Sequence, residues 1–242
     1  MNYQEYIPNS NIQGVVEKFW IVSDIKESYR ERIFPEGCTN LLFNISDTNS
    51  SLDILGINSI FSDFTPNPSD YYFGVSFKPG MLGALTKESL FLIKNQSIPS
   101  QEIIPQFDNN ILEKFIDLQT AKKRIVFVEN QLNKVINLNL NDTQLTNSVA
   151  NSIKSNYIQG TKNLAKNHNI SLRQLERKFK NEVGISMKLY ARLMRFNKAL
   201  TIIKSYPNRS LSEIAYDLGF YDHSHLTNEI KHFTGLQPSL FR

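Results

Sequence analysis

Two short stretches in the C-terminal third of the chain carry the side-chain types that recognise base edges in duplex DNA. Arg pairs with guanine, Gln or Asn with adenine, and Glu accepts a hydrogen bond from cytosine. In both stretches the apolar residues repeat at helical spacing, so the polar residues fall on the opposite face of a helix. The candidate base contacts are Arg173, Gln174, Glu176, Arg177, His223, Ser224, Thr227 and Asn228.

Basic residues around these stretches are candidates for contacts with the phosphate backbone. Such contacts provide affinity and register rather than a choice of sequence. The candidate phosphate contacts are Lys180, Lys188, Arg192, Arg195 and Lys231.

The distribution of charge also favours a polyanionic partner for the C-terminal part. The whole chain of 242 residues has a net charge of +4. Residues 1–150 contain 12 Lys and Arg against 17 Asp and Glu, a net of −5. Residues 151–242 contain 15 against 6, a net of +9, and hold all 4 histidines. Halves of opposite sign indicate two modules, of which the basic one faces a polyanion.

A weak internal repeat organises the basic part, and such a repeat indicates a duplicated supersecondary unit. Leu164-Ala165 recurs as Ile214-Ala215 at an offset of 50, and Gly184-Ile185 recurs as Gly235-Leu236 at an offset of 51. Each unit has the pattern of a helix-turn-helix.

Capping residues mark the helices of these units. Ser171 with Gln174 forms the S-x-x-Q pattern of a capping box, and Ser210 with Glu213 forms a second box. Asp222 is expected to cap the last helix.

Turns at Asn169 and Gly219 are expected to separate the two helices of each unit, and one long helix over Ser186–Ser205 is predicted to join the units. A rigid helix would hold the two reading helices about 34 Å apart, the distance between successive major grooves on one face of DNA. Tandem reading helices in one chain imply a direct, non-palindromic site.

The N-terminal part is predicted to form a small antiparallel sheet or partial barrel. The predicted strands Val15–Ser23, Arg30–Ile45, Ser51–Ser59 and Tyr71–Phe77 are rich in β-branched and aromatic residues and are separated by turn formers.

Apolar residues after Pro79-Gly80 take up helical spacing. We expect a helix and a second turn over residues 81–91 and helices over residues 111–116 and 125–136; the last two could pack on the sheet or on a second copy. A polar linker over Asn137–Thr146 places the boundary near residue 145. The prediction is thus an α+β domain over residues 1–144, with strands to about residue 78, and an all-α domain over residues 145–242, made of two helix-turn-helix units joined by a long helix.

The residue types of the N-terminal part argue against an enzyme. Residues 1–150 contain no histidine, which excludes a His-ligated metal site there, and the chain has no glycine-rich phosphate loop. Cys38 is the single cysteine, and neither His nor Arg stands beside it to lower its pKa, so a buried structural thiol is favoured over a nucleophile. We expect no catalytic residues, no metal and no cofactor.

The sequence favours a cytoplasmic protein. It has no apolar run near the roughly 20 residues that span a bilayer, and its first residues show no basic-then-apolar leader.

The segments Ile214–Leu226 and Thr234–Arg242 closely resemble the signature of AraC/XylS transcription regulators, a bacterial family, and Leu164–Ser186 matches the other half of that domain. The resemblance covers about residues 150–242 and implies sequence-specific DNA binding. By position it assigns base reading to Arg173, Glu176, Arg177, His223, Ser224 and Asn228. Asn228 stands where the family usually has Arg, and Ile230 where it usually has Phe.

The segments Pro35–Asn44 and Gly74–Gly80 more faintly resemble the cupin-like sensor domain of one branch of the same family. That resemblance implies an effector-binding or dimerising domain. Trp20, Phe34, Phe43 and Tyr72 are the candidates for an effector pocket. Residues 111–136 are the candidates for a homodimer contact, with Phe127, Val128, Leu132 and Val135 as its apolar residues.

Two classes of function fit these features. The first is a regulator that binds double-stranded DNA, with RNA polymerase as an expected partner and a small-molecule effector as a candidate one. The alternative is a protein-interaction module that sequesters another regulator or an RNA polymerase subunit. The basic charge and the outward Arg, Gln and Asn side chains favour the regulator.

Overall fold

The computed structural model describes residues 1–86, 88–136, 144–156 and 161–242. Two clusters of buried apolar side chains divide these residues. The first cluster contains residues between Ile12 and Ile136. The second cluster contains Ile57 and residues between Val149 and Phe233. Ile57 comes from the N-terminal part of the chain but is buried in the second cluster. The two halves therefore share a hydrophobic core at this point.

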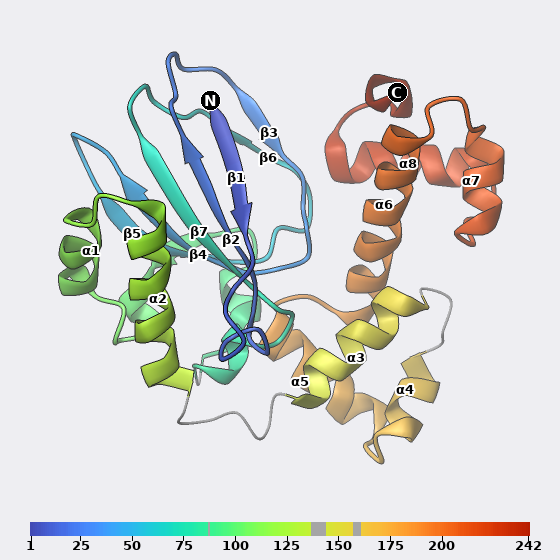
Figure 1. The fold of residues 1–242 in the computed structure, drawn as a ribbon. Coiled ribbons are helices and arrows are strands. Elements are labelled where there is room, and N and C mark those ends of the chain that lie inside the picture. The colour runs from blue at the N-terminus through green and yellow to red at the C-terminus, as the bar shows by residue number, and fades with distance from the viewer. Residues whose placement is uncertain (87, 137–143, 157–160) are drawn as a thin grey trace.

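The N-terminal half is built on β-strands. Within the described residues these are β1 (Asn2–Tyr6), β2 (Val16–Ser23), β3 (Glu31–Ile33), β4 (Asn40–Ile45), β5 (Ser51–Leu55), β6 (Ser62–Phe64), β7 (Tyr71–Phe77) and β8 (Ser97–Pro99). A six-stranded antiparallel sheet has the order β1-β2-β7-β4-β5-β8, and β3 pairs with β6 in a separate ribbon (Figure 1). Successive side chains of a strand point to opposite faces. In β2, Phe19 and Ile21 are therefore buried in the core, while Lys18 and Trp20 lie half-buried on the other face.

Two helices cover the apolar face of this sheet, α1 (Asn109–Ile116) and α2 (Ala121–Ile136) (Figure 1). The Phe115 ring of α1 stacks on Phe43, with ring centroids 4.0 Å apart, and meets Phe73 edge-on at 5.1 Å. Of the two arrangements that the helical spacing allows, the helices adopt packing on the sheet.

The C-terminal half is helical. Its helices are α3 (Gln144–Ser155), α4 (Thr161–Asn167), α5 (Leu172–Val183), α6 (Met187–Ser205), α7 (Leu211–Asp217), α8 (His223–Thr234) and the short 3-10 helix η5 (Pro238–Phe241). In Figure 1, α6 runs from the α4–α5 unit to the α7–α8 unit. The α+β and all-α architecture predicted from the sequence is confirmed. No helix in these described ranges is long and apolar enough to cross a membrane.

The predicted strand Arg30–Ile45 is wrong in its middle. A turn at Pro35-Glu36-Gly37 divides it into β3 and β4, which belong to different sheets. Gly37 has a φ of +87°, a left-handed conformation that interrupts a strand and that glycine adopts readily. The strands β1, β6 and β8 are not predicted because their side chains are exposed or half-buried and lack apolar alternation.

Of the helix and second turn predicted over residues 81–91, the helix is wrong. The segment forms two short 3-10 turns, η1 (Leu82–Ala84) and η2 (Leu90–Ile93). A methyl group on Gly83 would lie 2.7 Å from the Cα atom of Glu182 in α5. Gly83 therefore docks closely against α5, while Met81, Leu82, Leu85 and Leu90 are buried in the first core cluster.

The predicted linker Asn137–Thr146 lies largely outside the described residues, which resume at Gln144. Its last residues belong to α3, whose Thr146, Val149 and Ile153 are buried at helical spacing where α3 packs against α5 and α6. A domain boundary near residue 145 stays a prediction.

Replacing Phe115 with Ala should create a cavity under α1. We expect the free energy of unfolding to fall by about 3–5 kcal/mol, as measured by urea denaturation. The neighbouring Ile116 is 36% exposed, and Ile116→Ala should cost about 1 kcal/mol or less. Equal losses for the two variants would contradict this placement of α1.

Candidate nucleic-acid interface

The first helix-turn-helix unit consists of α4 and α5. Asn169 forms the turn with a φ of +51°, the positive value that its sequence position predicts. The Ser171 hydroxyl accepts a hydrogen bond from the backbone N–H of Gln174, whose side chain in turn accepts from the Ser171 N–H at 3.2 Å. This capping box confirms the predicted start of α5, and Gly184 ends the helix in a left-handed conformation.

The N-terminal half of α5 presents the predicted base-reading residues to solvent. Arg173, Gln174, Glu176 and Arg177 are all exposed, while Leu175 on the opposite face is fully buried. Because the N-terminal residues of a recognition helix are those that reach base edges, this is the expected presentation. The Gln174 carbonyl oxygen is already used by the cap, so its NH₂ group is the part left to face a base.

The second unit, α7 and α8, repeats this construction. Ser210 and Glu213 form the predicted capping box of α7, Gly219 makes the turn with a φ of +68°, and the Asp222 carboxylate accepts from the His225 N–H at 2.7 Å. Within α8, His223, Ser224 and Asn228 are exposed, Thr227 is half-buried, and the apolar face is buried through Leu226, Ile230 and Phe233.

The predicted phosphate-contacting residues fall into different environments. Lys188 and Lys231 are exposed. Lys180 lies on the same stripe of α5 as Arg173 and Arg177, and its ammonium group sits over the Phe91 ring of η2, 3.5 Å from the ring centroid.

Arg192 is engaged inside the domain. Its guanidinium donates two hydrogen bonds to the buried carboxylate of Glu229 in α8, at 3.0 and 2.8 Å, and this hydrogen bonding raises the pKa of Arg192. A bidentate pair of this kind fixes orientation as well as distance. It therefore helps to fix the orientation of α8 against α6.

Arg195 is held in a similar way. It donates to the backbone carbonyl of Gly219 at 3.0 Å, lies over the Phe220 ring at 4.2 Å, and burial lowers its pKa. The structure thus places Arg192 and Arg195 as residues that position the second unit, and their contact with phosphates stays a prediction.

Sequence reasoning missed two exposed aromatic residues of the second unit. Tyr216 is 86% exposed and Tyr221 is 93% exposed, and Tyr221 stands directly before the cap of α8. Tyr216 lies off the apolar stripe of α7, and Tyr221 precedes α8. This placement could have identified both tyrosines as exposed.

Comparison with known proteins agrees with this geometry. Residues 164–242 match a family model described as a helix-turn-helix domain, and residues 4–99 match a domain of unknown function (DUF6597). Over 92 residues the chain is 37% identical to the uncharacterised HTH-type transcriptional regulator YfiF of Bacillus subtilis (strain 168). That match covers 37% of this chain and only 29% of the relative's length. The C-terminal domain is an AraC-type helix-turn-helix domain.

Two of the solved structures that match the chain do so at low sequence identity. The C-terminal domain of AraT, a response regulator from Geobacillus stearothermophilus, is 23% identical with a TM-score of 0.38, over 40% of this chain and 83% of that one. ToxT from Vibrio cholerae is 14% identical with a TM-score of 0.47, over 99% of this chain and 96% of that one.

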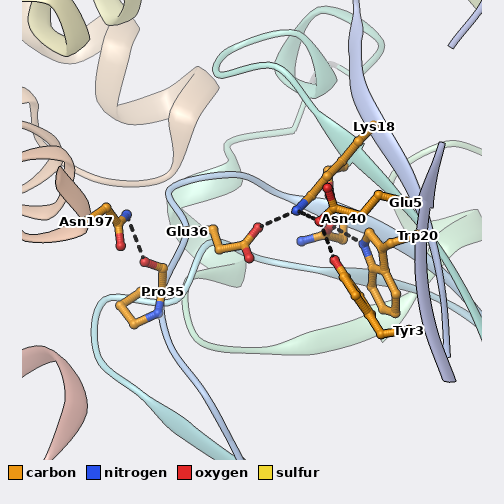
Figure 2. Close-up of polar contacts among 9 residues, drawn as sticks. Tyr3, Glu5, Lys18, Trp20, Pro35, Glu36, Asn40 and Asn197 are labelled. Atoms are coloured by element: carbon orange, nitrogen blue, oxygen red, sulfur yellow. Dashed lines mark hydrogen bonds and ion pairs between the residues drawn. The ribbon is translucent and has the colours of Figure 1, made fainter. Parts of the chain in front are cut away.

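The N-terminal half meets the long helix of the AraC-type domain at the turn Pro35-Glu36-Gly37. Asn197 of α6 donates to the Pro35 carbonyl at 3.2 Å, as Figure 2 shows. Gly37 has a left-handed φ of +87°, and a methyl group on it would lie 2.3 Å from the end of the Met194 side chain, so glycine is favoured in this turn against α6. The Pro35–Gly37 motif thus serves a contact between the two halves.

A polar cluster fastens this turn to the sheet (Figure 2). The Lys18 ammonium lies 3.3 Å from the Glu36 carboxylate and 2.7 Å from that of Glu5 in β1. Burial alone would lower the pKa of Lys18, but the hydrogen bond that Lys18 donates to Glu5 and the charge of Glu36 raise it. Lys18 therefore stays a cation that links β1, β2 and the turn.

The four residues predicted to line an effector pocket lie in different surroundings. Trp20 donates to Asn40 at 3.2 Å, and Phe34 packs edge-on against Phe241 of the AraC-type domain. Phe43 is fully buried in the first core cluster, and the Tyr72 hydroxyl donates to Asp70 at 2.7 Å. The existence of an effector pocket stays a prediction.

The apolar residues predicted to form a dimer helix are mostly unavailable to a second copy. Val128, Leu132 and Val135 are buried in the first core cluster, and Phe127 is partly buried against it. These residues are therefore core residues, and this part of the prediction is wrong: the face of α2 that they form covers the sheet.

The surroundings of Cys38 are those of an unreactive thiol. The residue is half-buried, less than the sequence predicts, but burial of its thiol raises the pKa of Cys38 to about 12. Groups of three or more His, Cys, Asp and Glu side chains that could hold a metal ion are absent from the ranges that the structure describes.

Replacing Glu229 with Gln should leave the Arg192 guanidinium without its countercharge. Because Arg192 is about one-third exposed, we expect a loss of about 2–3 kcal/mol in the free energy of unfolding, somewhat less than for a fully buried pair. Asp217→Asn, which breaks the more exposed pair with Arg209, should cost less than about 1 kcal/mol. Urea denaturation of both variants measures the difference, and a smaller loss for Glu229→Gln would contradict the positioning role.

Alkylation should distinguish the Cys38 thiol from an activated one. With a pKa of about 12, only about one thiol in ten thousand is ionised at pH 8, whereas an ordinary thiol with a pKa of about 8.5 is roughly one-quarter ionised. Iodoacetamide should therefore modify the folded protein far more slowly than the urea-unfolded protein. Similar rates, followed by mass spectrometry, would show that this burial is incorrect.

Proposed function

We propose that the protein is a sequence-specific transcription regulator whose helices α5 and α8 read successive major grooves of duplex DNA. The observation that carries this proposal is the repeated presentation of polar residues at the starts of two capped helices joined by one rigid helix. The family match of residues 164–242 supports it. Such a regulator would work in the cytoplasm of a bacterium, with RNA polymerase as its partner.

The proposed base contacts come from the exposed N-terminal halves of the two helices. Arg173 and Arg177 are suited to guanine, Gln174 and Asn228 to adenine, and Glu176 to cytosine, with His223, Ser224 and Thr227 beside them. Asn228 is exposed on α8 and stands where the family usually has Arg. In this proposal Asn228 still contacts a base, but it recognises a different base from the one that Arg would recognise.

The proposed phosphate contacts are the exposed Lys188 and Lys231, together with Lys180 at the far end of the α5 stripe. Arg192 and Arg195 act in this proposal through the orientation of α8 and of its turn. Because lysine–phosphate contacts release counterions, affinity should fall steeply as salt is raised.

For the N-terminal half we propose a regulatory role, through an effector or through pairing of two chains. Its contacts with α6 at Pro35 and Gly37 provide a physical route from that half to the reading helices. The buried face of α2 is not part of this proposal.

Single substitutions should separate base contacts from phosphate contacts. DNA duplexes selected from a random pool by the wild-type protein supply the site, and dissociation constants are measured by fluorescence anisotropy. Arg173→Ala or Arg177→Ala should cost about 1–3 kcal/mol at particular base pairs and relax the preference there.

Lys188→Ala or Lys231→Ala should weaken binding to all duplexes alike and reduce the slope of log affinity against log salt by about 1. An equal loss across sequences for the arginine variants would instead assign Arg173 and Arg177 to phosphates. Failure of the wild type to select any duplex at low salt would overturn the proposal.

A further inference from the structure

A short loop of the N-terminal half contacts both helix-turn-helix units. This bridging loop, Ile57–Phe61, lies between β5 and β6. A methyl group on Gly184 would lie 2.9 Å from Cγ2 of Ile57, and one on Gly235 would lie 2.8 Å from Cε1 of Phe61. These glycines are the left-handed residues that end α5 and α8, and they occupy equivalent positions of the repeat. One loop therefore contacts the same point of both reading helices.

At the α8 end, Phe61 acts together with Arg32 of β3. The Arg32 guanidinium lies over the Phe61 ring, 4.2 Å from its centroid, and donates to the backbone carbonyl of Thr234 at 3.2 Å. That carbonyl belongs to the last residue of α8 and is among those that have no partner within the helix. Arg32 thus completes the hydrogen bonding of α8 from outside the C-terminal half.

At the α5 end, Ile57 is buried within the core of the C-terminal half. The Leu90 carbonyl oxygen would lie 3.1 Å from a methyl group on Gly184, and the Ser89 hydroxyl donates to the Asn181 side chain at 3.0 Å. The end of α5 is therefore held by the bridging loop and by η2 together.

Hydrogen bonds with Asn95 hold the bridging loop. The Asn95 N–H donates to the Ile57 carbonyl at 3.1 Å, and the Asn95 side chain accepts from the Ser59 N–H at 2.7 Å. Asn95, which has a φ of +59°, thus contacts the loop through both its backbone and its side chain. These hydrogen bonds hold the loop at Ile57 and at Ser59.

We propose that the bridging loop sets the separation of α5 and α8, so that Ile57 and Phe61 determine which distance between two half-sites the protein accepts. Four residue steps span at most about 14 Å, which with the two side chains limits the helix ends to roughly 30 Å apart. The loop thus limits the C-terminal ends of α5 and α8, whereas the proposed base contacts lie in their N-terminal halves and would reach successive major grooves about 34 Å apart. This inference rests on the proposed function, because it concerns how the two reading helices are spaced on DNA.

The test compares binding at different half-site spacings. A duplex selected by the wild-type protein is remade with one or two base pairs inserted between the half-sites, and the ratio of dissociation constants for inserted and original duplexes is measured. Because each ratio is internal to one protein, partial inactivity of a variant cancels. The wild type should lose about tenfold or more in affinity on insertion, since both helices can no longer bind at once.

The variant Arg32→Gln with Phe61→Ala removes the α8 contact of the bridging loop. We expect its ratio to fall to about threefold or less, because α8 can then shift relative to α5. The matched control is Arg30→Gln with Phe64→Ala. Arg30 also pairs with Asp63, and Phe64 packs edge-on against Tyr72 within the N-terminal half. The control should keep the wild-type ratio.

Three results would overturn the inference. The Arg32–Phe61 variant could keep the wild-type ratio of dissociation constants, or the control could lose as much of that ratio as the variant does. The third such result is a wild-type protein whose affinity does not change with the spacing. In each of those cases the wild type still selects a duplex, so the proposed function survives. Failure of the wild type to select any duplex would instead overturn the proposed function and this inference with it.

Discussion

The burial of α6 is the interaction on which the arrangement of the C-terminal half depends. A surface helix usually buries one stripe, but α6 is covered by α3 and α5 near its start, by α7, α8 and η5 near its end, and by the Pro35–Gly37 turn between them. Its buried residues are Met187, Tyr190, Leu193, Met194, Phe196, Ala199, Leu200 and Ile203. Any movement of one helix-turn-helix unit relative to the other must therefore disturb this shared core.

Much of the C-terminal half could be predicted because the residues that start and end its helices act on their near neighbours in the sequence. A capping box or a turn residue acts within three or four positions, so Ser171, Ser210, Asp222 and Asn169 reveal their roles in the sequence itself. Arg192 and Arg195 show where this reasoning stops. Charge and helical position predict a phosphate contact, but Glu229 and Gly219 engage them from more than 20 residues away.

In the N-terminal half, the long strands could be predicted from their alternation, whereas segments shaped by distant contacts could not. Residues 81–91 have helical apolar spacing, yet they form two short 3-10 segments, in which Gly83 closely approaches the α5 backbone. The paired role of Ile57 and Phe61 is equally invisible in sequence, because their partners Gly184 and Gly235 lie more than 120 residues further along.

The contrast in charge between the halves does not hold them together. In the described part of the chain, the ion pairs lie within one half or the other. The contacts between halves are instead apolar contacts, hydrogen bonds to backbone carbonyls, the hydrogen bond from Ser89 to Asn181, and the contact of the Lys180 ammonium with the Phe91 ring. Salt therefore screens the surface proposed to face DNA more than the surface between the halves. In the proposed complex, the acidic half would be repelled by the DNA phosphates, which would favour contact through the basic face.

The burial of Ile57 in the second core cluster has a consequence for how the protein unfolds. A C-terminal fragment cut at residue 145 would contain every helix of the AraC-type domain but would leave the Ile57 site as an empty hollow. Conversely, opening of the sheet around β5 would withdraw a buried side chain from the other half. The two halves are therefore thermodynamically coupled, and heat should melt them in one cooperative transition although the chain passes from one to the other only once.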